Sequence, residues 1–154
     1  MDKISGGGYL ICNTGYVLWL HGSEDRWGEE GLKDYKFYCF NGTPKYLYVS
    51  ENMDCHEKAR ISFLDMDYKK APFGRDDYKE FDIIPQEPEN FEKMKLLACE
   101  LAKDIPFLRV DFYEIAHKIY FGELTFYPCA GFMPFNPKEW DEKMGELIIL
   151  PKIH

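Results

Sequence analysis

The feature that most constrains the fold is an Asn41-Gly42 dipeptide between two runs rich in aromatic and β-branched residues. The run DYKFYCF (Asp34–Phe40) precedes the dipeptide, and KYLYV (Lys45–Val49) follows it shortly afterwards. Asn-Gly between two such runs is a strong signal for a tight β-hairpin turn, because both residues tolerate the positive φ that the turn needs. The chain is therefore predicted to build its first clear element as a β-hairpin.

Three later segments continue the strand pattern. RISFLDM (Arg60–Met66) reads as a third strand, and Phe107–Glu114 and Lys118–Phe126 read as a pair of long strands. Between these groups, residues 67–88 carry many charges and three prolines, and we expect a mobile loop there.

Two helices complete the expected set of elements. Apolar residues recur at helical spacing after Pro88, which predicts a helix over residues 89–103. A short terminal helix is expected over Pro137–Leu147, with Asn136 as its N-cap. The order of three strands, loop, helix, two strands and helix predicts an α+β fold, in which helices pack on an antiparallel sheet.

Length and composition indicate one domain with an unusual beginning. The chain has 154 residues, enough for a single core, and 45% of them are hydrophobic. Seven of the twelve glycines fall in residues 1–31, so we expect a glycine-rich N-terminal segment there and one domain over residues 32–154.

Net charge and cysteine content indicate which binding partners and which cellular compartment to expect. The formal net charge of −8 has the wrong sign for binding nucleic acid or an anionic membrane surface. The run Tyr16–Leu20 is too short for a membrane span, and no export signal precedes it. Five cysteines, without any CxxC pair, argue against a disulfide framework. We therefore expect a cytoplasmic protein with reduced thiols.

The last strand pair carries the clearest chemical pattern. If its turn is centred on His117, Asp111 lies opposite Glu123 and Arg109 lies opposite Thr125, all four on one face. Two facing carboxylates repel each other unless one is protonated or a cation lies between them, and Mg²⁺ suits such oxygen ligands. Arg109 would then bind a transferring phosphoryl group. The alternative, two solvated carboxylates in a different register, stays open.

The same strands resemble a known family. FLRVDFYEIAHKIYFGELTFYPCAGF (Phe107–Phe132) is similar to the closing hairpin of the ATP-grasp superfamily. More closely, DYKFYCFNGTPKYLYV, LAKD, GELTFYP and FNPKEWDEKMGEL resemble the TupA-like ATP-grasp branch, which is named for teichuronopeptide biosynthesis. Members of that branch are often labelled polysaccharide-biosynthesis proteins or glycosyltransferases. The resemblance covers residues 32–151 and implies the second lobe of an ATP-grasp fold.

The resemblance also implies roles for individual residues. Asp111 and Glu123 match the magnesium ligands, and Thr125 stands where many relatives have Asn. Arg109 matches the residue that stabilises the phosphate or the reaction intermediate. Asp34 matches the acidic residue that receives the ribose hydroxyls of ATP, and the loop residue Lys69 is either a triphosphate contact or a solvated lysine.

The N-terminal segment does not resemble a first lobe. Lys3 with Gly6–Gly8 is either an imitation of a phosphate-binding loop or a flexible glycine-rich stretch. We accordingly expect a truncated family member that binds ATP poorly by itself, has no appreciable activity alone, and uses a partner lobe or self-associates weakly.

Three functions remain in consideration. The first is an ATP- and Mg²⁺-dependent ligase that joins a carboxylate to an amine through an acyl phosphate, acting on a small-molecule or polysaccharide-linked carboxylate. The second is a non-catalytic remnant or interaction module. The third is a glycosyltransferase, for which Asp65-Met66-Asp67 would be the metal motif.

Overall fold

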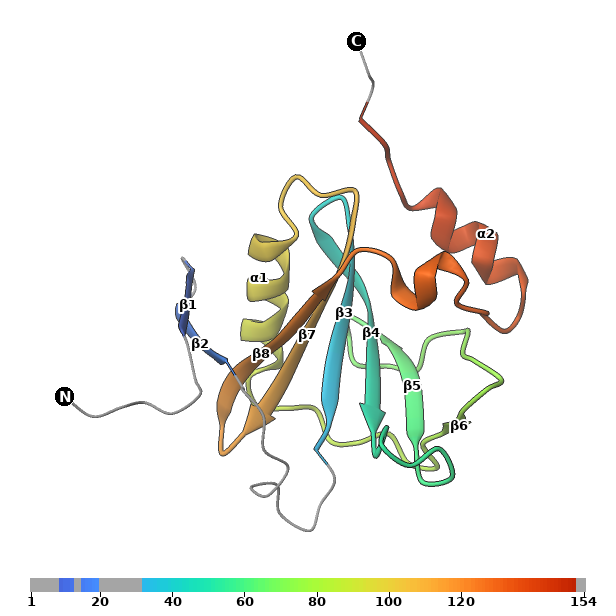
Figure 1. Cartoon of the computed structure of the whole chain (residues 1–154), viewed down its shortest axis with the longest axis horizontal. Helices are drawn as coiled ribbons and strands as arrows, with labels where there is room; N and C mark the ends of the chain where they lie inside the picture. Colours follow the sequence, from blue (N-terminus) through green and yellow to red (C-terminus); the bar gives the residue numbers. More distant parts are fainter. Residues whose placement is uncertain (1–8, 13–14, 20–31, 152–154) are drawn as a thin grey trace, which may run out of the picture.

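The computed structural model describes residues 9–12, 15–19 and 32–151, and its centre is one eight-stranded sheet in the order β1-β2-β8-β7-β3-β4-β5-β6 (Figure 1). In chain order the elements are β1 (Tyr9–Cys12), β2 (Gly15–Trp19), β3 (Asp34–Phe40), β4 (Thr43–Glu51), β5 (Arg60–Asp65), β6 (Lys79–Glu80), α1 (Phe91–Leu101), β7 (Phe107–Ile115), β8 (Lys118–Thr125), the 3-10 helix η2 (Pro128–Gly131) and α2 (Glu139–Glu146).

The five central strands β8, β7, β3, β4 and β5 pair antiparallel throughout. The pairings of β2 with β8 and of β5 with β6 are parallel, and β1 pairs antiparallel with β2 at the edge of the sheet. This arrangement confirms the α+β fold expected from the order of the elements. The sequence did not predict that strands from residues 9–19 would extend the sheet beyond β8.

The β3–β4 turn is the hairpin expected at Asn41-Gly42. Both residues have positive φ, 50° and 79°, and Phe40 pairs directly with Thr43 across the turn. Positive φ at both central positions is the geometry of a type I′ turn, whose twist matches that of the flanking strands. The local sequence therefore suffices to explain this element.

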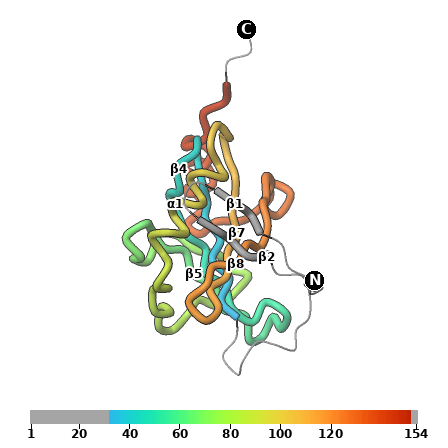
Figure 2. The backbone as a smooth tube through the Cα atoms, turned by 90° about the vertical axis from the view of Figure 1, so that its left-hand side faces the viewer, coloured from blue at the N-terminus to red at the C-terminus, as the bar shows by residue number. Residues whose placement is uncertain are grey.

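The two faces of the sheet are covered differently. Helix α1 packs Phe91, Met94, Leu97 and Ala98 on one face, against alternate residues of the central strands. The other face meets an aromatic cluster that includes Phe63, Phe73 and Met144, contributed partly by α2 and the segment before it. With the strands seen edge-on, α1 and the segment that follows β8 lie on opposite sides (Figure 2).

Two local expectations differ from the structure. The terminal helix begins at Glu139, and Asn136 does not cap it. Instead, the Asn136 backbone exchanges hydrogen bonds with Gly74, and its Nδ2 donates to Asp76 Oδ1 at 2.6 Å. The segment 67–88 is not an open loop, because Phe73 is 3% exposed and packs in the aromatic cluster. A tertiary contact between residues 74 and 136 outweighs the local capping preference.

Lys3 and Gly6–Gly8, considered above as a phosphate loop, lie outside the described residues. Within the described ranges, no helix has the length and apolar character needed to cross a membrane.

Candidate functional site

A strip of charged side chains crosses the sheet on the face away from α1. Strand alternation produces it, because Tyr35 and Phe37 of β3 point into the α1 core while Asp34 and Lys36 point to the opposite face. On β7 the same alternation sends Val110 to the core and leaves Arg109 and Asp111 on the strip. We call this set, completed by Glu123 and Thr125 of β8, the charged strip.

Arg109 is the cation between the two carboxylates. Its Nε donates to Asp111 Oδ1 at 2.8 Å, and its Nη2 donates both to Asp111 Oδ2 at 2.7 Å and to Glu123 Oε1 at 2.5 Å. Burial by itself would lower the pKa of Arg109, but the hydrogen bonds and charge of Asp111 outweigh it and raise the pKa above the ordinary value. The guanidinium is therefore a cation of the kind that the sequence analysis expected between the two carboxylates, and it relieves their repulsion without a metal ion.

Asp111 is the most buried member of the strip. The residue is 1% exposed, whereas the side chain of Glu123 is 62% exposed. A buried carboxylate is tolerated only with full hydrogen bonding, and Asp111 has it from Arg109 and from Lys36, whose Nζ lies 3.1 Å from Oδ2. Removing either Arg109 or Lys36 would leave the buried carboxylate of Asp111 with fewer hydrogen bonds to offset its charge.

Lys36 is a member of the charged strip that the sequence analysis did not identify as a candidate site residue. Its ammonium group donates to both Asp34 and Asp111, so it joins β3 to β7 across the strip. The signal was present in the alternation of DYKFYCF, where Asp34, Lys36 and Tyr38 share one face. What the sequence did not show is that β7 is the strand beside β3, which places Lys36 directly opposite Asp111.

Asp34 has one oxygen without a partner. Its Oδ2 accepts from Lys36 and from Tyr113 Oη at 3.3 Å, while its Oδ1 is buried and unpaired among the described residues. Burial raises the pKa of Asp34 to about 6, and the opposing charge of Lys36 only partly offsets this effect. An unpaired buried oxygen is costly, and hydroxyl donors from a ligand would satisfy it.

The register of β7 and β8 differs from the expected one near the turn and agrees farther away. The turn is Ala116-His117, both with positive φ, rather than a turn centred on His117. Tyr113 therefore pairs with Tyr120, and a bulge between Val110 and Phe112 then shifts the register so that Arg109 pairs with Thr125 as expected. The predicted turn was wrong by one residue, and the bulge shifts the strands by one residue in the opposite sense, so the predicted pairing of Arg109 with Thr125 is found.

Gly122 makes the bulge possible. A Cβ at this position would lie 3.1 Å from the Asp111 carbonyl oxygen and 3.0 Å from Tyr113 Cε2. A residue without a side chain lets β8 approach this closely without displacing Asp111 or Tyr113, and across this close approach Asp111 and Glu123 bind the same guanidinium. The hydroxyl of Thr125 donates to Glu123 Oε1 at 3.1 Å, so Thr125 also reaches the strip.

Lys69 and Asp65 are not brought to the charged strip. Lys69 lies in the turn after β5, with its side chain 74% exposed and its Nζ 3.7 Å from Asp67. Asp65 Oδ1 accepts from the backbone N–H groups of Asp67 and Lys69, both at 2.9 Å. This pattern is typical of a side chain that stabilises its own turn, and it favours a structural role for Asp65-Met66-Asp67.

The donor set of the strip is chemically suited to a hard divalent cation. Asp111, Glu123 and Thr125 offer carboxylate and hydroxyl oxygens, which Mg²⁺ prefers. Within the described ranges, no group of three or more acidic, histidine or cysteine side chains could hold a metal ion. An ion held here would therefore take further oxygens from a phosphate ligand, and Arg109 would have to release part of its contact with the carboxylates.

Comparison with known proteins assigns the chain to a family. The family model described as TupA-like ATPgrasp matches residues 20–149, which include every member of the charged strip. No curated protein and no solved structure matches the chain. Because the family model spans most of the sequence, the chain belongs to the TupA-like ATPgrasp family.

Proposed function

We propose that the charged strip binds the phosphates of ATP together with Mg²⁺. In this proposal, residues 32–154 act as the second lobe of a ligase that joins a carboxylate to an amine through an acyl phosphate. The observation that carries the proposal is the placement of two cations, Arg109 and Lys36, over partly buried carboxylates on one face of the sheet. Membership of an ATP-grasp family supports the nucleotide as the ligand. Support for a polysaccharide-linked substrate comes from the family resemblance alone.

Each residue has a role that its surroundings allow. Asp111, Glu123 and Thr125 would hold the Mg²⁺ ion, which, when bound, neutralises phosphate charge during phosphoryl transfer. The hydrogen bonds from Arg109 to the two carboxylates use Nε and Nη2, which leaves Nη1 for a phosphate or acyl-phosphate oxygen. Asp34 would accept ribose hydroxyls through its unpaired Oδ1.

The chemistry requires no nucleophilic side chain. The substrate carboxylate attacks the γ-phosphorus and ADP departs, after which the amine attacks the acyl carbon and releases phosphate. The chain contributes positive charge that is already held in position before the reaction, which is the main means of stabilising a transferring phosphoryl group. Lys36 carries a positive charge of this kind, because Asp34 on the same strand and Asp111 on β7 hold its ammonium group in place.

Paramagnetic broadening tests the proposal even if ATP binds weakly. Mn²⁺ with ATP should broaden the amide resonances of residues 109–111 and 122–125 most strongly, and those of α1, on the opposite face, much less. The Glu123→Gln variant should lose the broadening, and Glu142→Gln, an equally conservative change on the exposed part of α2, should keep it.

Two outcomes would contradict the proposal. Broadening that survives in Glu123→Gln would show that the ion binds elsewhere. A folded protein without any broadening near residues 122–125 would reject the ATP site and favour the non-catalytic interaction module.

A further inference from the structure

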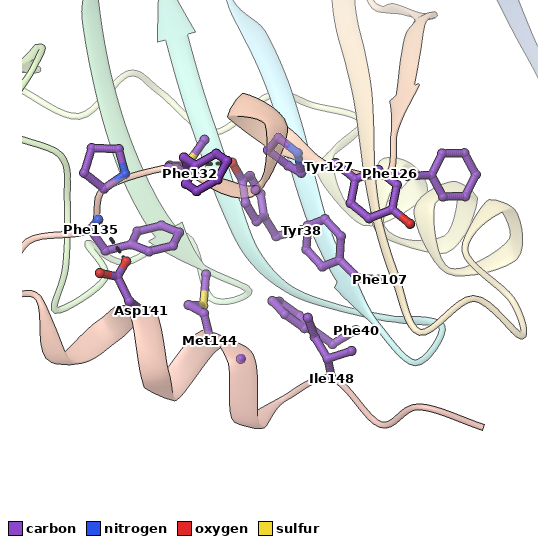
Figure 3. A pocket seen from close by; sticks show the side chains of 15 residues that line it. Tyr38, Phe40, Phe107, Phe126, Tyr127, Phe132, Phe135, Asp141, Met144 and Ile148 are labelled. Atoms are coloured by element: carbon purple, nitrogen blue, oxygen red, sulfur yellow. Dashed lines mark hydrogen bonds between the residues drawn. The ribbon is translucent and has the colours of Figure 1, made fainter. Parts of the chain in front are cut away.

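A pocket of about 530 Å³ lies beside the charged strip, on the same face of the sheet. Its floor is formed by side chains of β3 and β7, including Tyr38, Phe40 and Phe107. The segment after β8 closes one side, and α2 closes the other (Figure 3). The volume falls within the range of about 300–1,000 Å³ that is usual for small-molecule sites.

The walls of the pocket are aromatic and carry little charge. Seven of its fifteen lining residues are Phe or Tyr, and Met133 and Met144 add flexible thioethers. Asp141 is the one charged residue among the described residues that line it. Such walls favour a flat apolar group, and Asp141 disfavours a second negative charge at that end.

The floor of the pocket holds a hydroxyl group with a weak acceptor. Tyr38 is 2% exposed, and its hydroxyl donates to Met133 Sδ at 3.3 Å. A thioether is a weak acceptor, so an oxygen atom of a ligand would be a better partner for this hydroxyl.

The pocket and the charged strip are continuous. Tyr38 pairs with Arg109 in the β3–β7 register, and Phe126 and Tyr127 of the pocket wall directly follow Thr125. Arg109 and Lys36 are both paired with carboxylates of the strip, but Arg109 Nη1 makes no hydrogen bond among the described residues, whereas Asp141 places a carboxylate in the lining of the pocket itself. A ligand with an acidic head and an apolar tail could therefore direct its acid to Arg109 Nη1 and place its tail in the pocket.

We propose that the pocket binds the flat apolar tail of the carboxylate substrate, with its acid group directed toward Arg109 and Lys36. This assignment rests on the proposed ligase function and adds the substrate class, an acid with an aromatic or similarly flat, uncharged tail. The phosphorylated atom would then lie at the strip, while the tail is held between α2 and the segment after β8.

Methionine methyl groups report on the pocket directly. Met133 and Met144 line it, whereas Met94 belongs to α1 and packs on the other face of the sheet. In the whole chain labelled with ¹³C at the methionine methyl groups, 3-phenylpropionate should shift the signals of Met133 and Met144 and leave Met94 unchanged. Propionate, which lacks the tail, and 2-phenylethylamine, which carries the opposite charge, should shift them much less.

Gly145 allows the pocket to be filled without disturbing the fold. It lines the pocket, and a Cβ placed on it meets no atom within 4 Å. Gly145→Leu should weaken the binding of 3-phenylpropionate at least about tenfold, and Gly145→Ala should change it little. Thermal unfolding of both variants shows that the loss of binding is not a loss of folding.

Three results would overturn the proposal. The first is binding of 2-phenylethylamine as tightly as the acid, which would reject the direction of the head group. The second is a methyl shift that follows protein concentration without ligand, which would make a second copy of the chain the occupant. The third is the absence of methyl shifts in protein that still shows Mn²⁺·ATP broadening at residues 122–125, which would reject the pocket alone and leave the proposed function standing.

Discussion

Gly122→Ala should destabilise the protein, although replacing glycine by alanine within a strand normally does the opposite. An ordinary replacement gains about 0.4–1 kcal/mol through the unfolded chain, because alanine has fewer conformations to lose. At Gly122 the new methyl group would lie 3.1 Å from the Asp111 carbonyl oxygen and 3.3 Å from its Cβ. These atoms belong to or adjoin the backbone of β7, so they cannot move aside cheaply.

The size of the effect follows from this overlap. Forcing a methyl group into a filled site costs about 1–3 kcal/mol, which exceeds the gain from the unfolded state. For a chain of this length, each kcal/mol corresponds to about 2–4 °C in the melting temperature. We therefore expect Gly122→Ala to melt several degrees below the original protein.

Thermal unfolding followed by circular dichroism measures the change, with Gly145→Ala as the matched control. Gly145 lies in α2 with open space where its Cβ would be, so alanine there should stabilise the helix by up to about 1 kcal/mol. If Gly122→Ala is as stable as the original protein, the close approach of β8 to Asp111 is wrong, and with it the geometry of the charged strip.

Three further substitutions probe other parts of the molecule. Asp111→Asn should cost about 3–5 kcal/mol in urea unfolding, because it leaves Arg109 without its buried partner. Glu123→Gln, at an exposed side chain, should cost no more than about 1 kcal/mol, and equal costs would contradict the burial of Asp111. Asp34→Asn should stabilise the protein near neutral pH and lose this advantage in acid. Burial raises the folded-state pKa of Asp34 from 3.8 to about 6, so between these pH values the native state holds a proton that the unfolded state releases. The stability of the original protein therefore falls as pH rises from about 4 to about 6. A stability difference between the variant and the original protein that does not change with pH would refute this reasoning. Asn41→Ala should lower the free energy of unfolding by about 1–3 kcal/mol, because Asn41 has a φ of 50°. It should also speed amide hydrogen exchange at Ile149, whose N–H donates to Asn41 Oδ1 at 3.1 Å. An unchanged exchange rate at Ile149 would contradict this contact.

Local sequence was sufficient where the determining interactions lie within a few residues. The Asn41-Gly42 turn needs only the positive φ of its two residues, and the apolar stripe of α1 needs only helical periodicity. The alternation along β7 and β8 likewise predicted that Arg109 and Asp111 share one face. These are the elements whose positions agree with the sequence analysis.

Tertiary packing decided the chemistry of the strip. Lys36 and Asp111 are 75 positions apart in the chain, and they are in contact because β3 lies beside β7. The raised pKa of Asp34 depends on burial, which residue type alone does not specify. The cation between the carboxylates is Arg109, because a bulge at Gly122 brings Glu123 within its reach.

The sequence by itself therefore determined the type of each main element and the face on which the charged residues lie, since both follow from periodicities of two and 3.6 residues. Only the tertiary structure decided how the two predicted hairpins join into one sheet, which charges are buried, and where α2 closes an aromatic pocket against β3 and β7. Asn136 shows the physical reason: its preference for capping a helix is worth about 1 kcal/mol, and contacts with residues 74 and 76 outweigh it.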